Sequence, residues 1–432
     1  MTYEEARAFI DDTARYGAVL GLDSVTELMR RLGNPQDELK FVHIAGTNGK
    51  GSTLAYISTI LKEAGYRVGR YISPTIFDYR ERIQVNEEYI TREGVARLAG
   101  QVREACEQMV QDGFSHPTTF EVETAMAFLW FREMNCDIVV LECGMGGLTD
   151  ATNVVKTTLV SVFAEVGLDH MGFLGGTIEE IARVKAGIIK PGVKVVSAAQ
   201  RPEARKILLE TCQEMKADFR EVSREEIRDI RYGFEEQSFT YKGMKGLKPG
   251  LLGSWQIDNG ALAVEAVLAL GECGFPVTEE QMRKGLARTV WPGRFTVVDR
   301  HPLFVVDGAH NRDAADRLKE TLDLYFPHKR KIFIAGVLAD KEYDYVMGRL
   351  APLADRVITV MTPDNPRALP AESLAEDVKK YNDRVEAAGS LGDAVRRARA
   401  YAGEEDLILA FGSLSYLGEL IRQVRMMPGA GA

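Results

Sequence analysis

Cysteine is scarce in this chain, with five residues spread over 432 positions: Cys106, Cys136, Cys143, Cys212 and Cys273. Their spacing fits neither a disulfide framework nor a zinc site, so we expect reduced thiols in a cytoplasmic protein. No apolar run approaches the ~20 residues that a membrane-spanning helix needs. The first residues, Met1 to Glu5, lack the basic and apolar parts of an export signal. We therefore expect no membrane partner.

A basic stretch is also missing. The net charge is -9, from 54 Lys and Arg against 63 Asp and Glu, which argues against a nucleic-acid partner. A hydrophobic content of 45% is typical of a globular protein, and 432 residues suffice for two or three domains. An acidic protein that binds a polyanion must gather its cations locally.

A glycine-rich segment, Gly46-Thr47-Asn48-Gly49-Lys50-Gly51-Ser52, lies between the apolar run 41–45 and residues 53–61, which have helical spacing. A strand, a glycine turn and a helix N-terminus form an anion site, because backbone N–H groups and the helix dipole point at the ligand. Lys50 adds a cation, and Ser52 or Thr53 a hydroxyl for Mg²⁺. The spacing departs from the usual P-loop, and the alternative is a tight turn with an exposed lysine. The motif predicts a nucleotide site and leaves its chemistry open.

Polar residues follow other predicted strands. The run 137–142 ends in Glu142, and an acid at a strand tip beside a P-loop is placed to hold magnesium. Glycines and Asp150 follow it. The strand 158–162 leads to His170, and a helix from about residue 178 carries Lys185. Taken singly, these residues are ordinarily a solvated glutamate, a surface histidine and a solvated lysine.

The segment Trp291-Pro292-Gly293-Arg294-Phe295 interrupts the pattern and predicts a domain boundary. We expect a P-loop domain over residues 1–293 and a smaller α/β domain over 294–432. Strands are predicted at 303–306, 331–335, 356–361 and 406–411, and a weaker one near 385, with helices between them in a mostly parallel, Rossmann-like sheet. The first of these strands leads into Asp307 to Asn311, at the edge where open α/β sheets bind ligands.

These motifs together resemble the folylpolyglutamate and dihydrofolate synthases of the Mur ligase superfamily. The segments that carry the resemblance are Gly46 to Ser52, Ser73-Pro74, Arg80 to Ile83, Thr119 to Glu121, Glu142 to Asn153, Gly167 to Met171, Lys185 to Ile188, Pro292 to Arg294 and Asp307 to Asn311. The resemblance implies an α/β fold, with a Mur-ligase-type ATPase domain followed by a Rossmann-like domain and ATP between them. It implies that ATP phosphorylates a carboxylate of a reduced folate or dihydropteroate, and that the amine of L-glutamate attacks the acyl phosphate.

The resemblance also implies roles for single residues. Those implied to bind ATP are Gly46, Thr47, Asn48, Gly49, Lys50, Gly51, Ser52, Asn259, Arg294 and Asp307. The implied magnesium ligands are Ser52, Ser73, Glu142 and His170, and the implied catalytic residues are Lys50, Lys185, His170 and His310. The implied substrate contacts are Thr119, Phe120, Glu121, Asp150, His310 and Ser413. Lys185 matches a lysine that family members carbamylate, and a monovalent cation is a further candidate cofactor.

Two departures from the family pattern, Thr75 and Leu148-Thr149, lie near the expected acceptor site and leave the pterin substrate open. Two alternatives remain: a Mur-type ligase acting on another carboxylate, such as a cell-wall precursor, and a nucleotide switch without ligation. The segment Arg80 to Asn86 and the lack of a separate UDP-binding domain argue against a cell-wall enzyme. Polar strand tips in a second domain, at Asp307 and His310, argue against a switch. We expect a monomer with small-molecule partners.

Overall fold

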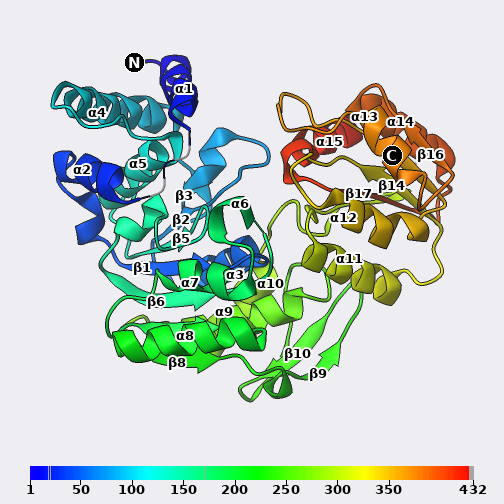
Figure 1. Ribbon diagram of the computed structural model, residues 1–432. Coiled ribbons are helices and arrows are strands. Elements are labelled where there is room, and N and C mark those ends of the chain that lie inside the picture. Colours follow the sequence, from blue (N-terminus) through cyan, green and yellow to red (C-terminus); the bar gives the residue numbers. More distant parts are fainter. Residues whose placement is uncertain (18, 20, 170, 428–432) are drawn as a thin grey trace. The chain divides into compact units, whose positions relative to one another are not determined.

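The computed structural model describes residues 1–17, 19, 21–169 and 171–427, which form two compact units (Figure 1). Unit 1 comprises Met1–Arg228, Thr240–Leu247 and Asp258–Thr289. Unit 2 comprises Asp229–Phe239, Lys248–Ile257 and the chain from Val290 onward. Each unit has its own sheet and its own core.

Unit 1 is built on an eight-stranded sheet in the order β4-β3-β2-β5-β1-β6-β7-β8. The strands are β1 (Phe41–Ala45), β2 (Val68–Tyr71), β3 (Ile83–Val85), β4 (Glu88–Tyr89), β5 (Ile138–Glu142), β6 (Thr158–Phe163), β7 (Lys194–Ser197) and β8 (Asp218–Glu221). Strands β2, β5, β1, β6, β7 and β8 pair in parallel, while β3 pairs antiparallel to β2 and β4. The central strands are buried along their whole length because helices cover both faces, which is why they read as continuous apolar runs.

The helices of unit 1 surround this sheet, some of them through other helices. They are α1 (Tyr3–Asp12), α2 (Asp23–Arg31), α3 (Lys50–Glu63), α4 (Arg92–Gln111), α5 (Thr119–Glu133), α6 (Met171–Leu174), α7 (Ile178–Ala186), α8 (Pro202–Met215), α9 (Gln256–Gly271) and α10 (Glu279–Arg288). Helix α1 packs on α4 and α5, and α10 packs on α3. One core cluster joins α1, α2, α4 and α5 to the sheet, with Phe41 of β1 edge-on to Phe128 of α5 at 5.5 Å between ring centroids. Another joins α7 and α8 to β6 and β7. This packing fixes the strand ends that carry the polar loops.

Unit 2 contains a six-stranded sheet in the order β12-β13-β17-β14-β15-β16. Its strands are β12 (Thr296–Arg300), β13 (Leu303–Val306), β14 (Lys331–Ala335), β15 (Arg356–Thr359), β16 (Val385–Ala387) and β17 (Leu407–Phe411). Its helices are α11 (Arg312–Tyr325), α12 (Tyr343–Leu350), α13 (Ala371–Val378), α14 (Leu391–Tyr401) and α15 (Leu414–Met426). All strand pairs are parallel except β12 with β13. A separate three-stranded sheet has the order β11-β10-β9, formed by Met244–Leu247, Ser238–Tyr241 and Arg228–Arg231.

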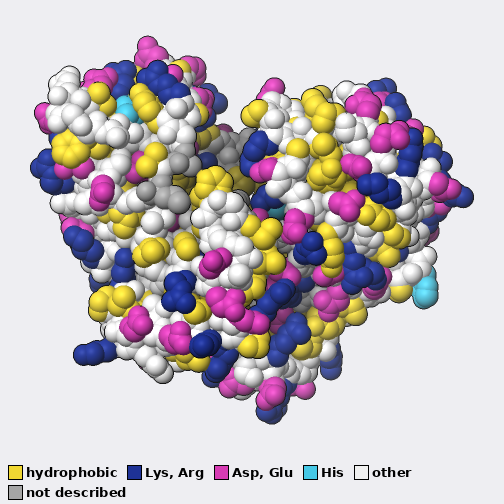
Figure 2. Space-filling view, in the orientation of Figure 1, with side chains coloured by type: hydrophobic (Ala, Val, Ile, Leu, Met, Phe, Trp, Pro, Cys, Tyr) yellow, Lys and Arg dark blue, Asp and Glu magenta, His cyan; other side chains and the backbone are white. Residues whose placement is uncertain are grey.

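The α/β fold class and the mostly parallel second sheet are confirmed. The five cysteines are free thiols, as expected. The residues that the structure describes include no helix with the length and apolarity of a membrane span. Figure 2 shows cationic and anionic side chains interspersed over the visible face, so positive potential for a polyanion has to come from a local arrangement.

Candidate active site

Several parallel strands of unit 1 end at the same edge of the sheet and carry the predicted site residues there. Gly46 follows β1, Glu142 ends β5, and Ser73 lies two residues beyond β2. Strands β2, β5 and β1 are adjacent in the sheet, so their carboxyl ends lie side by side. The topology therefore brings together segments separated by about a hundred residues in sequence, at the edge where open α/β sheets bind ligands.

The glycine-rich loop ends at Gly49, and α3 begins at Lys50. The backbone of Gly49 has a φ of +88°, a conformation that favours glycine. A Cβ at this position would also come within 2.5 Å of Oδ1 of Asn259. Asn259, predicted to bind the nucleotide, thus lies directly against the loop. The first-turn N–H groups of α3 point out of the helix end, which provides an anion-binding terminus.

Two lysines converge on the carbonyl oxygen of Gly46. Nζ of Lys50 lies 3.2 Å from this oxygen and 3.9 Å from Oε1 of Glu142. Nζ of Lys185, on α7, donates to the same oxygen at 2.9 Å. The loop, the acidic strand end and α7 are thereby joined, and the cations an acidic protein needs are gathered at one point.

Lys185 is buried, with 4% of its surface exposed, so the ordinary expectation of a solvated lysine is wrong. Burial, aided by the positive charge of Lys50, lowers its pKa from 10.5 to about 7. A substantial fraction of such an amine is neutral near pH 7, and the neutral form is the nucleophile that carbamylation requires.

Thr47 ties the loop to the segment after β6. Its N–H donates to the carbonyl of Glu165 at 2.7 Å, and its hydroxyl donates to the carbonyl of Gly167 at 2.9 Å. The N–H of Gly167 donates back to the hydroxyl at 3.0 Å. The predicted residue His170 lies outside the described residues.

Phe120 brings the start of α5 to the glycines after β5. A Cβ on Gly144 would come within 2.5 Å of Cζ of Phe120, so the ring rests directly on the glycine backbone. The Phe120 and Tyr71 rings are 5.8 Å apart, and Tyr71 ends β2 two residues before Ser73. Phe120 is half-buried, which leaves part of the ring available to a ligand.

The neighbours of Phe120 are engaged within the protein. Glu121 accepts the N–H and hydroxyl of Thr118 at 2.7 and 2.9 Å and forms a capping box that starts α5. The hydroxyl of Thr119 accepts a hydrogen bond from Thr13 at 2.9 Å. Of the three predicted contacts in this segment, Phe120 is the one that lies against the glycine loop.

Asp150 holds the loop after β5 in place through hydrogen bonds to its backbone. Its carboxylate accepts the N–H groups of Met145 at 2.8 Å and Thr152 at 3.1 Å. Burial raises its pKa, and the hydrogen bonds from the loop oppose this effect. Asp150 thus anchors the glycine loop beneath Phe120.

Three of the four predicted magnesium ligands lie within the described residues. Ser52 and Glu142 are buried and Ser73 is half-buried, each next to the carboxyl edge of β1, β5 or β2. Hydroxyl and carboxylate oxygens are the ligands that Mg²⁺ prefers. The described part of the chain holds no group of three or more His, Cys, Asp or Glu suited to a metal ion.

Unit 2 has its own polar edge. Strands β13 and β17 are parallel neighbours, with Val306 opposite Ala410, so Asp307 and Ser413 follow adjacent strand ends. Asp307 is buried and accepts the N–H groups of Phe295 and Ala309, both at 2.8 Å. Burial raises the pKa of Asp307, and the positive charge of Arg294 opposes this.

The remaining predicted residues of unit 2 surround this strand end. A Cβ on Gly308 would collide with the guanidinium of Arg294, which places Arg294 over the loop. Nδ1 of His310 lies 2.7 Å from the carbonyl of Gly308, so this nitrogen carries the proton and donates. Ser413 caps α15 by accepting the N–H of Ser415 at 3.2 Å. The structure therefore groups Arg294, Asp307, His310 and Ser413.

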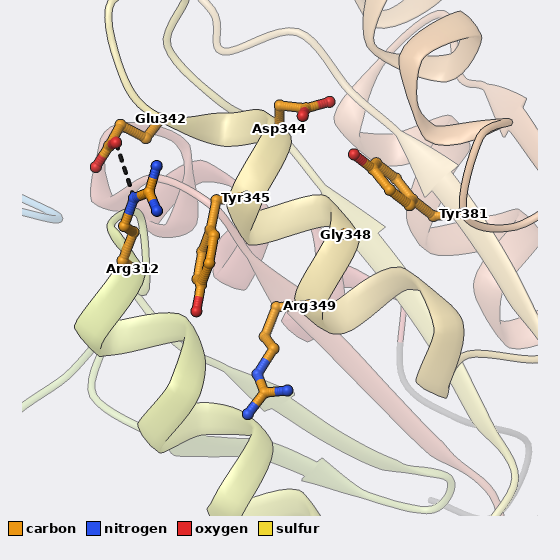
Figure 3. A pocket seen from close by; sticks show the side chains of 7 residues that line it. All are labelled: Arg312, Glu342, Asp344, Tyr345, Gly348, Arg349 and Tyr381. Carbon is orange, nitrogen blue, oxygen red and sulfur yellow. Dashed lines mark hydrogen bonds and ion pairs between the residues drawn. The ribbon is translucent and has the colours of Figure 1, made fainter.

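A separate hollow of about 580 Å³ lies between α11 and α12 in unit 2 (Figure 3). Both arginines that line it are in ion pairs: Arg312 with Glu342 of the same lining at 2.8 Å, and Arg349 with Asp316 outside it. The guanidinium of Arg312 also stacks on Tyr345. Because these cations are already neutralised, the hollow has less free positive charge for an anionic ligand than the strand ends have.

Two family descriptions match the chain over these regions. The Mur ligase middle domain matches residues 44–267, and the Mur ligase glutamate ligase domain matches residues 293–414. The first match alone spans more than half of the chain. With the nucleotide loop at the strand edge, it defines the class of protein: an ATP-dependent carbon–nitrogen ligase of the Mur type.

Whole-length relatives narrow the class. The chain is 35% identical to the dihydrofolate synthase/folylpolyglutamate synthase of Bacillus subtilis, over 98% of this chain and 99% of the relative. It is also 35% identical to the folylpolyglutamate synthase of Lacticaseibacillus casei, over 98% of each. Mycobacterium tuberculosis folylpolyglutamate synthase, solved with ADP and AMPPCP, superposes with a TM-score of 0.85 at 30% identity, over 92% of this chain and 94% of that one. The chain belongs to the folylpolyglutamate and dihydrofolate synthase family.

Two groups beside the site were not predicted from the sequence. The backbone carbonyl of Glu165 holds the glycine loop through Thr47, and nothing in a side-chain pattern signals a backbone contact. His43, in β1, was treated as one member of an apolar run. A single histidine inside an otherwise apolar strand directly before a P-loop was the available signal.

Proposed function

We propose that this ligase adds L-glutamate to the carboxylate of a reduced folate, of dihydropteroate, or of both, through an acyl phosphate. The observation that carries the proposal is the convergence of Lys50, Lys185 and Glu142 at the glycine-rich loop, in a chain that aligns end to end with enzymes of this name. Relatives named for one activity and for two are equally identical to it, so the acceptor is left to experiment.

The chemistry explains why cations gather at this loop. Transfer of a phosphoryl group from ATP to a carboxylate brings two anions together, so the site must supply positive charge and hold the reactants in line. Lys50 and the first-turn amides of α3 would hold the β- and γ-phosphates. Lys185, buried beside them, adds positive charge when protonated and is the candidate for carbamylation.

The oxygen ligands at the strand ends support a magnesium site. Ser52, Ser73 and Glu142 would hold the ion, which would neutralise charge on the phosphates. His170 belongs to the same proposal, by resemblance alone. On the acceptor side, Phe120 offers a ring face to a pterin, and Asp150 holds the loop under it, while Thr119 and Glu121 take part through the start of α5.

We propose residues 1–293 as the part of the chain that carries the ATP loop and folate site. Residues 294–432 would contribute to ATP through Arg294 and Asp307, and to glutamate through His310 and Ser413. A cytoplasmic monomer is part of the same proposal. The five free cysteines support the cytoplasmic location.

A substrate panel tests the proposed function. The chain is incubated with ATP, Mg²⁺ and labelled glutamate, together with dihydropteroate, monoglutamyl tetrahydrofolate or diglutamyl tetrahydrofolate. We expect labelled product with at least one acceptor, and ADP release that requires acceptor and glutamate together. ADP release that is equally fast without glutamate would support a switch and overturn the proposal, and a labelled product with an unrelated carboxylate alone would support a different Mur-type ligase.

A further inference from the structure

A chain of buried polar groups links β1 to the loop after β5. His43 of β1 is fully buried, with Nε2 2.9 Å from Oγ1 of Thr152 and 3.1 Å from Sγ of Cys143. The Thr152 hydroxyl donates to Oδ1 of Asp150. The other oxygen of Asp150 accepts the N–H of Met145. His43 has no role in the proposed ligation mechanism, although His43 lies three residues before the glycine-rich loop.

The hydrogen bonds in this chain have a definite direction. Because the Thr152 hydroxyl donates its proton to Asp150, its oxygen is left to accept, and His43 donates from Nε2. Nδ1 of His43 then carries a lone pair, and it has no hydrogen-bond partner among the described residues. Burial lowers the pKa of His43 to about 3, aided by the charge of Lys190, so the ring is neutral at physiological pH and serves as a fixed donor.

This series of hydrogen bonds ends at Asp150, in the loop that we propose to contact the pterin substrate. Asp150 binds the backbone of Met145 and Thr152 and so closes the loop between them. Gly144, the residue before Met145, supports the ring of Phe120. Loss of the Thr152 hydroxyl removes one donor from Asp150 and leaves the buried N–H of His43 with only the weak acceptor Sγ of Cys143.

We propose that His43 is a positioning residue for the pterin side of the site, acting through Thr152 on Asp150 and the loop that carries Gly144. The inference rests on the proposed function, since it takes Phe120 and Asp150 as the pterin side. His43 acts at a distance, because its side chain is enclosed by β1 and the loop and has no exposed surface.

Paired substitutions at Thr152 and His43 test this role. Thr152→Val and His43→Leu remove the hydrogen bonds, while Thr152→Ser and His43→Gln keep a hydroxyl and a donor. Thr158→Val is the matched control, because Thr158 is a buried threonine of β6 whose hydroxyl makes no hydrogen bond to any described residue. We expect Thr152→Val to raise the KM for dihydropteroate or tetrahydrofolate about tenfold and to change the KM for ATP less than about twofold.

The expected pattern separates positioning from general stability. The Ser and Gln variants should recover most of the lost affinity for the pterin substrate, and Thr158→Val should match the wild type. Equal increases in both KM values, or no recovery with Thr152→Ser, would overturn the proposal. If His43→Leu does not fold, the Thr152 pair alone decides the outcome.

Amide hydrogen exchange makes the test independent of the substrate. In Thr152→Val we expect faster exchange over residues 143–152 than in the wild type, with α8 unchanged. Unchanged exchange in this loop would refute the positioning role of His43 even if the enzyme accepts folates. If exchange is faster but the protein ligates no folate, the series of hydrogen bonds from His43 to the loop is supported and the proposed function is refuted instead.

Discussion

Replacing Lys185 with methionine should make the protein more stable at neutral pH while abolishing ligation. The side chain is 4% exposed, and its pKa is lowered from 10.5 to about 7 by burial. The native structure therefore bears the free-energy cost of a buried cation at neutral and lower pH. Methionine fills a similar volume without charge, so it removes this cost together with the function.

The magnitude follows from proton linkage. Below pH 7 the lysine is protonated in both the folded and the unfolded state, and the full cost applies. Between pH 7 and 10.5 the unfolded state binds more protons, so the stability of the wild type rises with pH. The difference between 10.5 and about 7 corresponds to about 5 kcal/mol. The hydrogen bond to Gly46, worth about 1–3 kcal/mol because its donor is charged, offsets part of this.

We therefore expect Lys185→Met to be about 3 kcal/mol more stable than the wild type at pH 6 and about 2 kcal/mol less stable near pH 10.5, because the wild type gains about 5 kcal/mol between these pH values and the variant does not. Unfolding by urea is followed by the fluorescence of Trp130, which lies on α5 of unit 1. Trp255→Phe and Trp291→Phe in both proteins remove the other two tryptophans. Buffers are freed of carbon dioxide, so that the amine stays unmodified.

An exposed lysine supplies the control. Lys206 on α8 has a side chain that is 75% exposed, so Lys206→Met should show no pH-dependent difference in stability. A stability difference between wild type and Lys185→Met that stays constant from pH 6 to pH 10.5 would refute the reasoning. The same holds if the variant is the less stable protein at pH 6.

Three further substitutions test other parts of the structure. Lys50→Ala should abolish turnover, because it removes the mobile cation of the phosphate loop, while the thermal midpoint stays near that of the wild type. Gly144→Ala should displace the ring of Phe120 and raise the KM for the pterin substrate, and Phe120→Leu should relieve the clash in a double variant. Arg70→Met should destabilise the protein by about 1–3 kcal/mol in urea titration, because it removes the hydrogen bonds that the buried guanidinium donates to Ser58 and to the half-exposed Glu87.

The glycine and arginine substitutions each have a control of the same chemical type. Gly100→Ala, where a Cβ meets open space, should leave both KM values unchanged. Arg103→Met removes an exposed guanidinium and should alter stability by less than about 1 kcal/mol. Ligation retained in Lys50→Ala would contradict the role of the loop, and a KM change for ATP alone in Gly144→Ala would contradict the assignment of the acceptor side.

The parts of the fold that could be predicted are those where burial alone shapes the sequence. Central strands such as β1 and β14, buried on both faces, appear as plain apolar runs, and their predicted bounds agree with the structure. Two other strands could not be recognised in this way. Strand β3 is buried but lies in the charged stretch from Arg80 to Asn86, and the edge strand β12 has only half-buried and exposed residues.

In the candidate site, too, some features could be predicted from the sequence and others could not. Its loops could be placed at strand ends by pattern, but contacts within it could not. Thr118 and Glu121 have the spacing of a capping box, a local signal that the sequence analysis read as a substrate contact. The burial of Lys185 had no local signal, since it depends on α7 packing beside Gly46, 139 residues earlier.

The carbonyl of Gly46 receives two ammonium groups, and this sharing has a thermodynamic consequence for ligand binding. A phosphate that draws Lys50 away from this oxygen weakens the repulsion felt by Lys185, so its affinity for a proton rises. Nucleotide capture near neutral pH should then be accompanied by proton uptake from the buffer. Titration calorimetry in buffers of different ionisation enthalpy would register that uptake as a buffer-dependent heat, which Lys185→Met should remove.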